Sequence, residues 1–144
     1  MNTRRLSPFL AVALIATIAL SVRAQDLYVG SNTPFNTLDI TTGTNAYSTT
    51  YVGYEVASFS NTLTVAGSGT LLTNSTNLYV GHSGSGNGLA ITNGGTVTVA
   101  GDANLGHQVG SDGNSLAVGG GAASSLSVGG VLNVGFGGVG NTLG

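Results

Sequence analysis

Histidine is the residue type in this sequence best suited to metal or acid–base chemistry, and it occurs twice. His82 and His107 each follow the glycine that ends a short apolar stretch, so they hold equivalent positions in adjacent repeats. Two imidazoles on neighbouring repeats could bind a metal ion. The next equivalent position is Phe136, however, and the earlier ones are Ser31 and Tyr54, which leaves no third ligand. We therefore expect a column of stacked rings, with no metal and no cofactor.

Carboxylates are the other candidates for chemistry. Asp102 and Asp112 are close in sequence, and glycoside hydrolysis uses two carboxylates that flank one bond. They fall at different corners of the repeat, so we expect no shared cleft. The stretch GSDGNSLAV, 110 to 118, resembles a glycine-rich calcium repeat. Calcium takes six to eight oxygens, whereas Asp112 is alone and precedes the glycine. We predict no catalytic residue and a protein that is not an enzyme.

All three basic residues lie at the start of the chain. Arg4 and Arg5 precede an apolar run, 9–22, and small residues at 22–24 complete the layout of a secretory signal peptide. The run is shorter than the ~20 residues of a spanning helix. We therefore predict a signal peptide over 1–24, no membrane insertion after its cleavage, and a secreted or cell-surface protein.

The chain after residue 24 contains no lysine, arginine or cysteine. Nucleic-acid binding depends on cations that neutralise phosphates, so it is not expected. Without cysteine, no disulfide framework can hold an exported chain of this size together. Its stability must come from another source, and the repeats supply a candidate.

A phrase of the form Asn-x-Leu-x-Val returns along the chain. Successive copies are 25, 26, 27 and 27 residues apart, and they begin at Asn36, Asn61, Asn87, Asn114 and Asn141. Two other stretches return within each period, clearest as LYVG at 78–81 and TVTV at 96–99. Apolar residues that alternate with small polar ones predict strands, and the Gly- and Asn-rich segments between them predict corners.

Three short strands per period predict an all-β fold, a parallel β-helix solenoid with coils of about 25–27 residues. Strand twist and crossover handedness favour a right-handed coil. The alternatives are a β-sandwich and a disordered glycine-rich chain. A sandwich needs longer strands of near-equal length, and a flexible chain would not keep the alternation.

Equivalent residues of consecutive coils should lie about 4.8 Å apart, one above another. We expect the leucines and valines of each strand to face inward. We expect the five repeated asparagines to form a hydrogen-bonded amide ladder at the corner. The alternative is that each asparagine only tolerates a left-handed turn. On the outer face, Tyr28, Tyr51 and Tyr79 form an aromatic column that could stack on sugars; the alternative is that they are solvent-side strand formers.

The regularity of the repeats also suggests a division of the chain into two segments. Residues 25–60 are less regular and predict a looser N-terminal coil, whereas residues 61–144 carry the regular repeats, the last of them incomplete. An open coil edge is an aggregation hazard. We therefore expect either a fragment of a longer array, which we favour, or end-to-end self-association.

These motifs resemble a known class of repeats. N-x-L-x-V, a glycine corner, a GTVTV-type strand and L-x-V-G, over residues 36–144, resemble the β-strand repeats of large secreted bacterial proteins. These include autotransporter-associated β-strand repeat proteins and repeat proteins with a PEP-CTERM sorting tail. The resemblance implies a parallel β-helix, export and a surface or passenger role, although the sequence itself contains neither a translocator barrel nor a sorting tail.

The sequence thus predicts a non-catalytic, exported structural segment of a surface or adhesin-like protein. The alternative is a secreted β-helix that binds or cleaves carbohydrate, with extracellular glycans as its partners.

Overall fold

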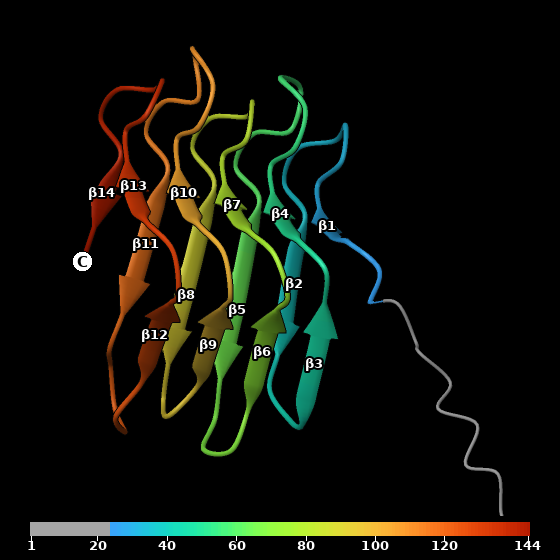
Figure 1. Ribbon diagram of the computed structural model, residues 1–144. Helices are drawn as coiled ribbons and strands as arrows, with labels where there is room; N and C mark the ends of the chain where they lie inside the picture. The colour runs from blue at the N-terminus through green and yellow to red at the C-terminus, as the bar shows by residue number, and fades with distance from the viewer. Residues whose placement is uncertain (1–23) are drawn as a thin grey trace, which may run out of the picture.

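The computed structural model describes residues 24–144, which form a parallel β-solenoid (Figure 1). Three strands make one coil, as predicted, and there are four full coils and the start of a fifth. The strands are β1 (Leu27–Val29), β2 (Thr37–Ile40), β3 (Thr44–Tyr47), β4 (Thr50–Val52), β5 (Thr62–Ala66), β6 (Leu71–Asn74), β7 (Leu78–Val80), β8 (Gly88–Thr92), β9 (Thr96–Val99), β10 (Ala103–Leu105), β11 (Ser115–Val118), β12 (Ser125–Val128), β13 (Leu132–Val134) and β14 (Thr142–Leu143).

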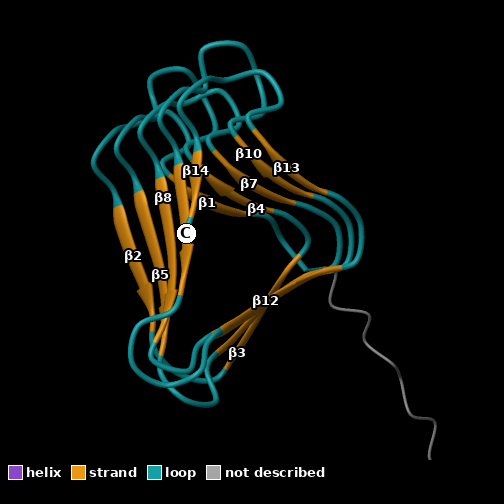
Figure 2. Cartoon of the chain, turned by 90° about the vertical axis from the view of Figure 1, so that its left-hand side faces the viewer, coloured by secondary structure: helices purple, strands orange, loops and turns teal. Residues whose placement is uncertain are grey.

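The strands form three parallel sheets, which we call A, B and C. Sheet A has the order β1-β4-β7-β10-β13, sheet B has the order β2-β5-β8-β11-β14, and sheet C has the order β3-β6-β9-β12. Figure 2 looks along the axis with the C-terminal end towards the viewer. The chain runs from sheet A through the upper loops to sheet B, then to sheet C, and approaches the viewer anticlockwise. The solenoid is therefore right-handed.

The core is a stack of aliphatic side chains that alternate with outward residues along each strand. The predicted inward pairs are confirmed: Leu63 and Val65 on β5, for example, are fully buried, and they lie in register with Leu89 and Ile91 on β8. Burial of this apolar surface is the main source of stability, because each fully buried aliphatic side chain contributes roughly 1.5–3 kcal/mol.

A polar pair inside the core was not predicted. Thr50 and Asn74 face inward and are buried, and the Thr50 hydroxyl donates to Asn74 Oδ1 at 2.9 Å. Asn74 Nδ2 then donates to the carbonyl of Asn77 at 3.2 Å. Hydrogen bonds offset the cost of burying these groups. Both residues are polar at positions where the next coil places Leu78 and Val99, so the alternation of residue types alone gave no sign of them.

The N-terminal segment, 25–60, joins the same three sheets. Its strands β1, β2 and β3 each pair in parallel with the strand of the next coil, so its backbone follows the path of the later coils. Its distinct features are side chains, such as Asn45 and Tyr47 at inward positions of β3. The predicted boundary at residue 60 falls in the loop between β4 and β5.

The predicted signal peptide, 1–24, lies outside the described residues apart from Ala24. Within residues 24–144, no helix has the length and hydropathy required to span a membrane.

Candidate functional site

The five repeated asparagines lie one above another and are joined by hydrogen bonds along the axis. We call them the amide column. In every coil after the first, Oδ1 of the asparagine accepts two hydrogen bonds from the preceding coil, one from the backbone N–H and one from Nδ2 of that coil's asparagine. For Asn87 Oδ1, the donors are Asn61 N at 2.9 Å and Asn61 Nδ2 at 3.0 Å. The same pair of bonds recurs at Asn61, Asn114 and Asn141, with distances of 2.8–3.1 Å.

The alternative interpretation of these asparagines, that each tolerates a left-handed turn, is wrong. None of the five has a positive φ; the left-handed residue is the one before it, for example Ser60 with a φ of 54° or Gly86 with a φ of 63°. The turn thus sits one residue earlier and aims the asparagine inward. The asparagines of the three middle coils, Asn61, Asn87 and Asn114, are at most 1% exposed.

A column of glycines makes room for the amides. Gly81, which ends the LYVG stretch, lies against the side chain of Asn114 in the next coil, and a Cβ at this position would overlap that amide. Gly30, Gly53 and Gly106 stand in the same relation to Asn61, Asn87 and Asn141. The sequence contains an indication of this contact, because a glycine and an asparagine recur together in each period. The contact itself joins adjacent coils, so it becomes visible only in three dimensions.

Aromatic rings form two further columns on the outer surface. Tyr28, Tyr51 and Tyr79 stack at centroid distances of 5.0 and 5.1 Å, with interplanar angles of 8° and 4°. We call them the tyrosine column. Beyond Tyr79 the same position is taken by Asn104 and then by Asn133, whose Nδ2 donates to Asn104 Oδ1 at 2.9 Å.

The second column contains both histidines. Its rings, which we call the imidazole column, stack at 5.1–5.5 Å and are Tyr54, His82, His107 and Phe136. The stack expected from the sequence is therefore present.

The two columns pack edge to face. Tyr79, for example, meets His82 and His107 at centroid distances of 5.1 and 5.0 Å with steep interplanar angles. Every ring except Phe136 thus has a ring neighbour within its own column and another beside it. Stacking on a sugar needs a free ring face, and here most faces are covered by other rings.

Two phenols of the tyrosine column, those of Tyr28 and Tyr51, stay protonated to higher pH than usual. Burial raises the pKa of Tyr51, and the carboxylate of Asp26 raises it further; the same two causes act, in the same order, on the pKa of Tyr28. These two side chains therefore present neutral hydroxyls.

Both histidines are half-buried. His107 Nδ1 is buried without a hydrogen-bond partner in the described structure, whereas His82 Nδ1 is 3.1 Å from Ser83 Oγ. Burial lowers the pKa of His82, and the neighbouring His107 lowers it further. The neutral form of His82 is thus the one that its surroundings favour.

We expect the free energy of unfolding to fall as the pH is lowered from 7.5 to 5.5. The unfolded chain takes up a proton on His82 near its ordinary pKa, about 6.5, whereas the folded chain takes it up only at lower pH. The stabilisation is therefore complete above pH 6.5 and is lost as the pH falls through the folded pKa. Urea unfolding at each pH measures this. The variant His82→Phe, which keeps a ring in the column, should reduce the slope, and an unchanged slope would contradict the prediction.

The two carboxylates that might have formed a catalytic pair, Asp102 and Asp112, each accept a hydrogen bond from a backbone N–H instead. Asp102 Oδ1 accepts the N–H of Val131 at 2.8 Å, and Asp112 Oδ1 accepts the N–H of Val139 at 2.8 Å. Each carboxylate thus links its own coil to the next at a corner. Among residues 24–144, no group of three or more His, Asp or Glu side chains could hold a metal ion.

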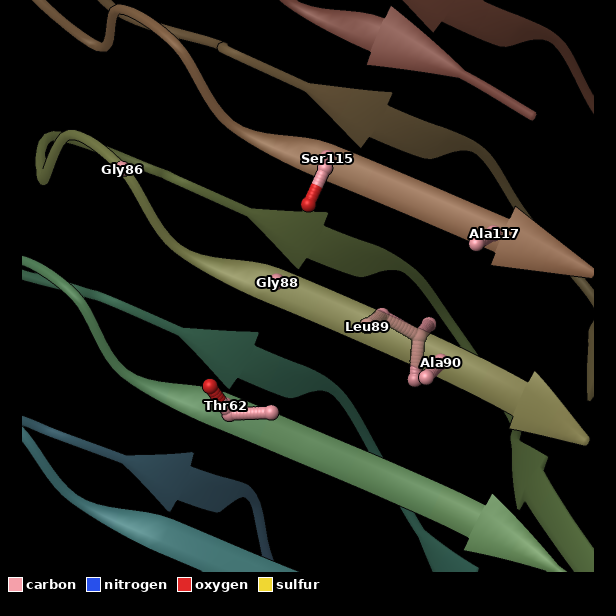
Figure 3. Close-up of a pocket in the computed structure, with 7 residues that line it drawn as sticks. All are labelled: Thr62, Gly86, Gly88, Leu89, Ala90, Ser115 and Ala117. Atoms are coloured by element: carbon pink, nitrogen blue, oxygen red, sulfur yellow. The ribbon is translucent and has the colours of Figure 1, made fainter.

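A shallow hollow of about 240 Å³ lies on the outer face of sheet B (Figure 3). It exists because Gly88, Ala90 and Ala117 carry little or no side chain, whereas the neighbouring Thr62 and Ser115 are larger. Two hydroxyls at its border could donate or accept hydrogen bonds. None of its lining residues is titratable, so the hollow offers contact surface but no catalytic group.

The chain was compared with protein-family models, with curated proteins and with solved structures, and no match was found in any of the three.

Proposed function

We propose that this chain is a non-catalytic, exported structural segment of a surface or adhesin-like protein. The amide column is the observation that carries the proposal, because it runs through all five coils and ties each of them to the next. A repeat array whose coils are all hydrogen-bonded to their neighbours is an elongated stack that grows by one coil per repeat. Such an elongated stack suits a protein that holds other segments away from a cell surface.

The chemistry of the side chains supports the structural role. The acidic residues that could have acted together each accept a backbone N–H, and the histidines lie within a ring stack. With no lysine or arginine after residue 23, the exported chain also offers no site to trypsin-like proteases. The similarity to β-strand repeats of secreted bacterial proteins favours the same role.

Export can be tested directly. We would express the 144-residue chain in a Gram-negative host, fractionate the cells and sequence the N-terminus of the product. A chain that begins at Gln25 outside the inner membrane supports the proposal. An unprocessed chain that stays in the cytoplasm contradicts the exported role.

Carbohydrate binding is the second candidate, and the tyrosine column is the observation that favours it. Tyr28 is 43% exposed, and the column places three phenol hydroxyls in a row along the axis. The phenol hydroxyls can donate and accept hydrogen bonds with a sugar even where the ring faces are covered. Extracellular glycans are therefore the partners that this surface would take.

We expect residues 25–144 to give no specific signal on a glycan array, because the rings cover one another's faces. If a glycan does bind, a Tyr51→Ala/Tyr79→Ala variant should lose the signal. The matched Tyr51→Phe/Tyr79→Phe variant keeps the stack and separates the contribution of the hydroxyls from that of the rings. If a glycan binds the parent but not the alanine variant, and circular dichroism shows that the variant is folded, the proposed structural role is replaced by a carbohydrate-binding role.

A further inference from the structure

The dipeptide Asn-Gly occurs twice in the chain, as Asn87 followed by Gly88 and as Asn93 followed by Gly94. Asparagine before glycine is prone to spontaneous deamidation, because glycine has no Cβ to hinder the attack of its backbone nitrogen on the amide carbon. The attack needs an amide group that can turn towards that nitrogen and an N–H that can lose its proton. The two sites differ in both respects.

The amide column protects the first site. Asn87 is 1% exposed; its Oδ1 accepts two hydrogen bonds from Asn61, and its Nδ2 donates to Asn114 Oδ1 at 3.1 Å. The N–H of Gly88 donates to the carbonyl of Asn61 at 2.8 Å. The amide carbon and the glycine nitrogen therefore cannot approach each other unless several hydrogen bonds in the middle of the column break.

The second site lies at the corner between β8 and β9, outside the amide column. Asn93 and Gly94 have φ values of 51° and 87°, and the N–H of Gly95 donates to the carbonyl of Thr92 across them at 2.9 Å. Positive φ values at both central residues define the tight turn that Asn-Gly favours. Asn93 is exposed, so its amide is open to water.

This corner belongs to an interior coil, with a neighbouring corner on each side. A Cβ on Gly94 would lie 3.1 Å from Ser68 Cα in the preceding coil, and the Asn93 side chain lies against Gly121 in the following one. The N–H of Gly94 donates to Ser124 Oγ, also in the following coil, at 3.1 Å. Such a bond holds the proton on the nitrogen. Protection of the second site thus depends on a side-chain hydroxyl, not on a buried network.

We propose that Asn93 is a site of spontaneous deamidation and that the hydroxyl of Ser124 sets its rate. The nitrogen of Gly94 bonds to Cγ of Asn93, the bond from Cγ to Nδ2 breaks, and Nδ2 leaves as ammonia with the proton that the glycine nitrogen gives up. Solvent water then adds to one of the two carbonyl carbons of the succinimide ring and breaks the bond from that carbon to the ring nitrogen. The products are aspartate and isoaspartate at position 93.

Deamidation changes the corner in two ways. It adds a negative charge to a chain whose residues 25–144 carry five acidic side chains and no lysine or arginine. Isoaspartate also inserts a methylene group into the backbone, next to the hydrogen bond that Asn93 N donates to the carbonyl of Gly120 at 2.8 Å. A chemical change that accumulates at the surface after folding goes beyond the role of an unchanging structural segment.

Incubation of the purified protein in mildly alkaline buffer, followed by peptide mass spectrometry, tests the proposal. Fragment ions assign the exchange of an amide for a carboxyl group to Asn87 or to Asn93, and methylation by an isoaspartate methyltransferase identifies the isoaspartate product. We expect Asn93 to lose its amide while Asn87 keeps it. In chemically unfolded protein, both sites should react at similar rates, because the protection of Asn87 comes from the fold.

The variant Ser124→Ala removes the acceptor of the Gly94 N–H. Deamidation of Asn93 should then accelerate about fivefold, the equivalent of one lost hydrogen bond. Hydrogen exchange of the Gly94 amide, followed by NMR, should accelerate with it. The matched control is Ser125→Ala, which removes the neighbouring hydroxyl, 3.3 Å from Thr96 Oγ1, and should react like the parent.

Circular dichroism verifies that each variant is folded. If Ser124→Ala does not fold, the ratio of the rates at Asn93 and Asn87 in the folded parent still decides whether Asn93 is the site. Deamidation of Asn93 that is no faster than that of Asn87 in the folded parent would overturn the proposal, and so would a folded Ser124→Ala variant that reacts at the parent rate.

Discussion

The substitution Asn87→Ala is expected to lower the free energy of unfolding by about 3–5 kcal/mol. It removes the oxygen that accepts both the backbone N–H and Nδ2 of Asn61, a residue with no exposed surface. Each buried donor left without a partner costs about 1–3 kcal/mol. Asn114 Oδ1 also loses one of its two donors. Urea denaturation, compared at constant m value, measures the loss.

The control for this substitution is Asn93→Ala. Asn93 is exposed, lies outside the amide column and has a φ of 51°. Its replacement should cost only about 1 kcal/mol, from the left-handed conformation that alanine adopts less readily. Equal losses in the two variants would show that the amide column contributes no more than an ordinary turn residue does.

The substitution Gly81→Ala is expected to have a comparable effect, again about 3–5 kcal/mol. The new methyl group would overlap the side chain of Asn114, which must then leave its place between Asn87 and Asn141. The φ of +75° at this position adds the strain of a left-handed alanine. Urea denaturation of the parent and the variant gives the difference.

Gly110→Ala separates these two causes. Gly110 has a φ of +85°, close to that of Gly81, but no atom lies within 4 Å of the place that its Cβ would take. The substitution Gly110→Ala should therefore lower the free energy of unfolding only through backbone strain, by about 1–2 kcal/mol. If Gly81→Ala loses no more than Gly110→Ala, the contact with Asn114 is not what requires glycine at position 81.

Much of the fold could be predicted because equivalent positions of successive coils carry similar residue types. Leu89 and Ile91 return as Leu116 and Val118 at a fixed distance, and only stacked coils bring such pairs into register. The stack of His82 on His107 follows from the same register. Thr50 and Asn74 could not be predicted in this way, because their burial depends on the hydrogen bond that they make across sheets A and C.

The candidate sites show the same division. The sequence identified the amide and tyrosine columns by their period, but it did not give the orientation of their side chains. The tyrosine rings could have presented their faces to solvent, yet the second column packs against them edge to face. Asp102 and Asp112 are close enough in sequence to suggest a catalytic pair. In the structure, each of them accepts a hydrogen bond from a backbone N–H of the following coil.

By itself, the sequence determined the class of fold, the length of the coil and the inward positions, since these depend on a pattern that repeats along the chain. Only the tertiary structure decided which groups meet between coils. The pairing of Gly81 with Asn114 joins residues of adjacent coils, 33 positions apart, and so does the pairing of Gly106 with Asn141. Such contacts depend on the path of the backbone around each corner, which the types of the residues alone do not specify.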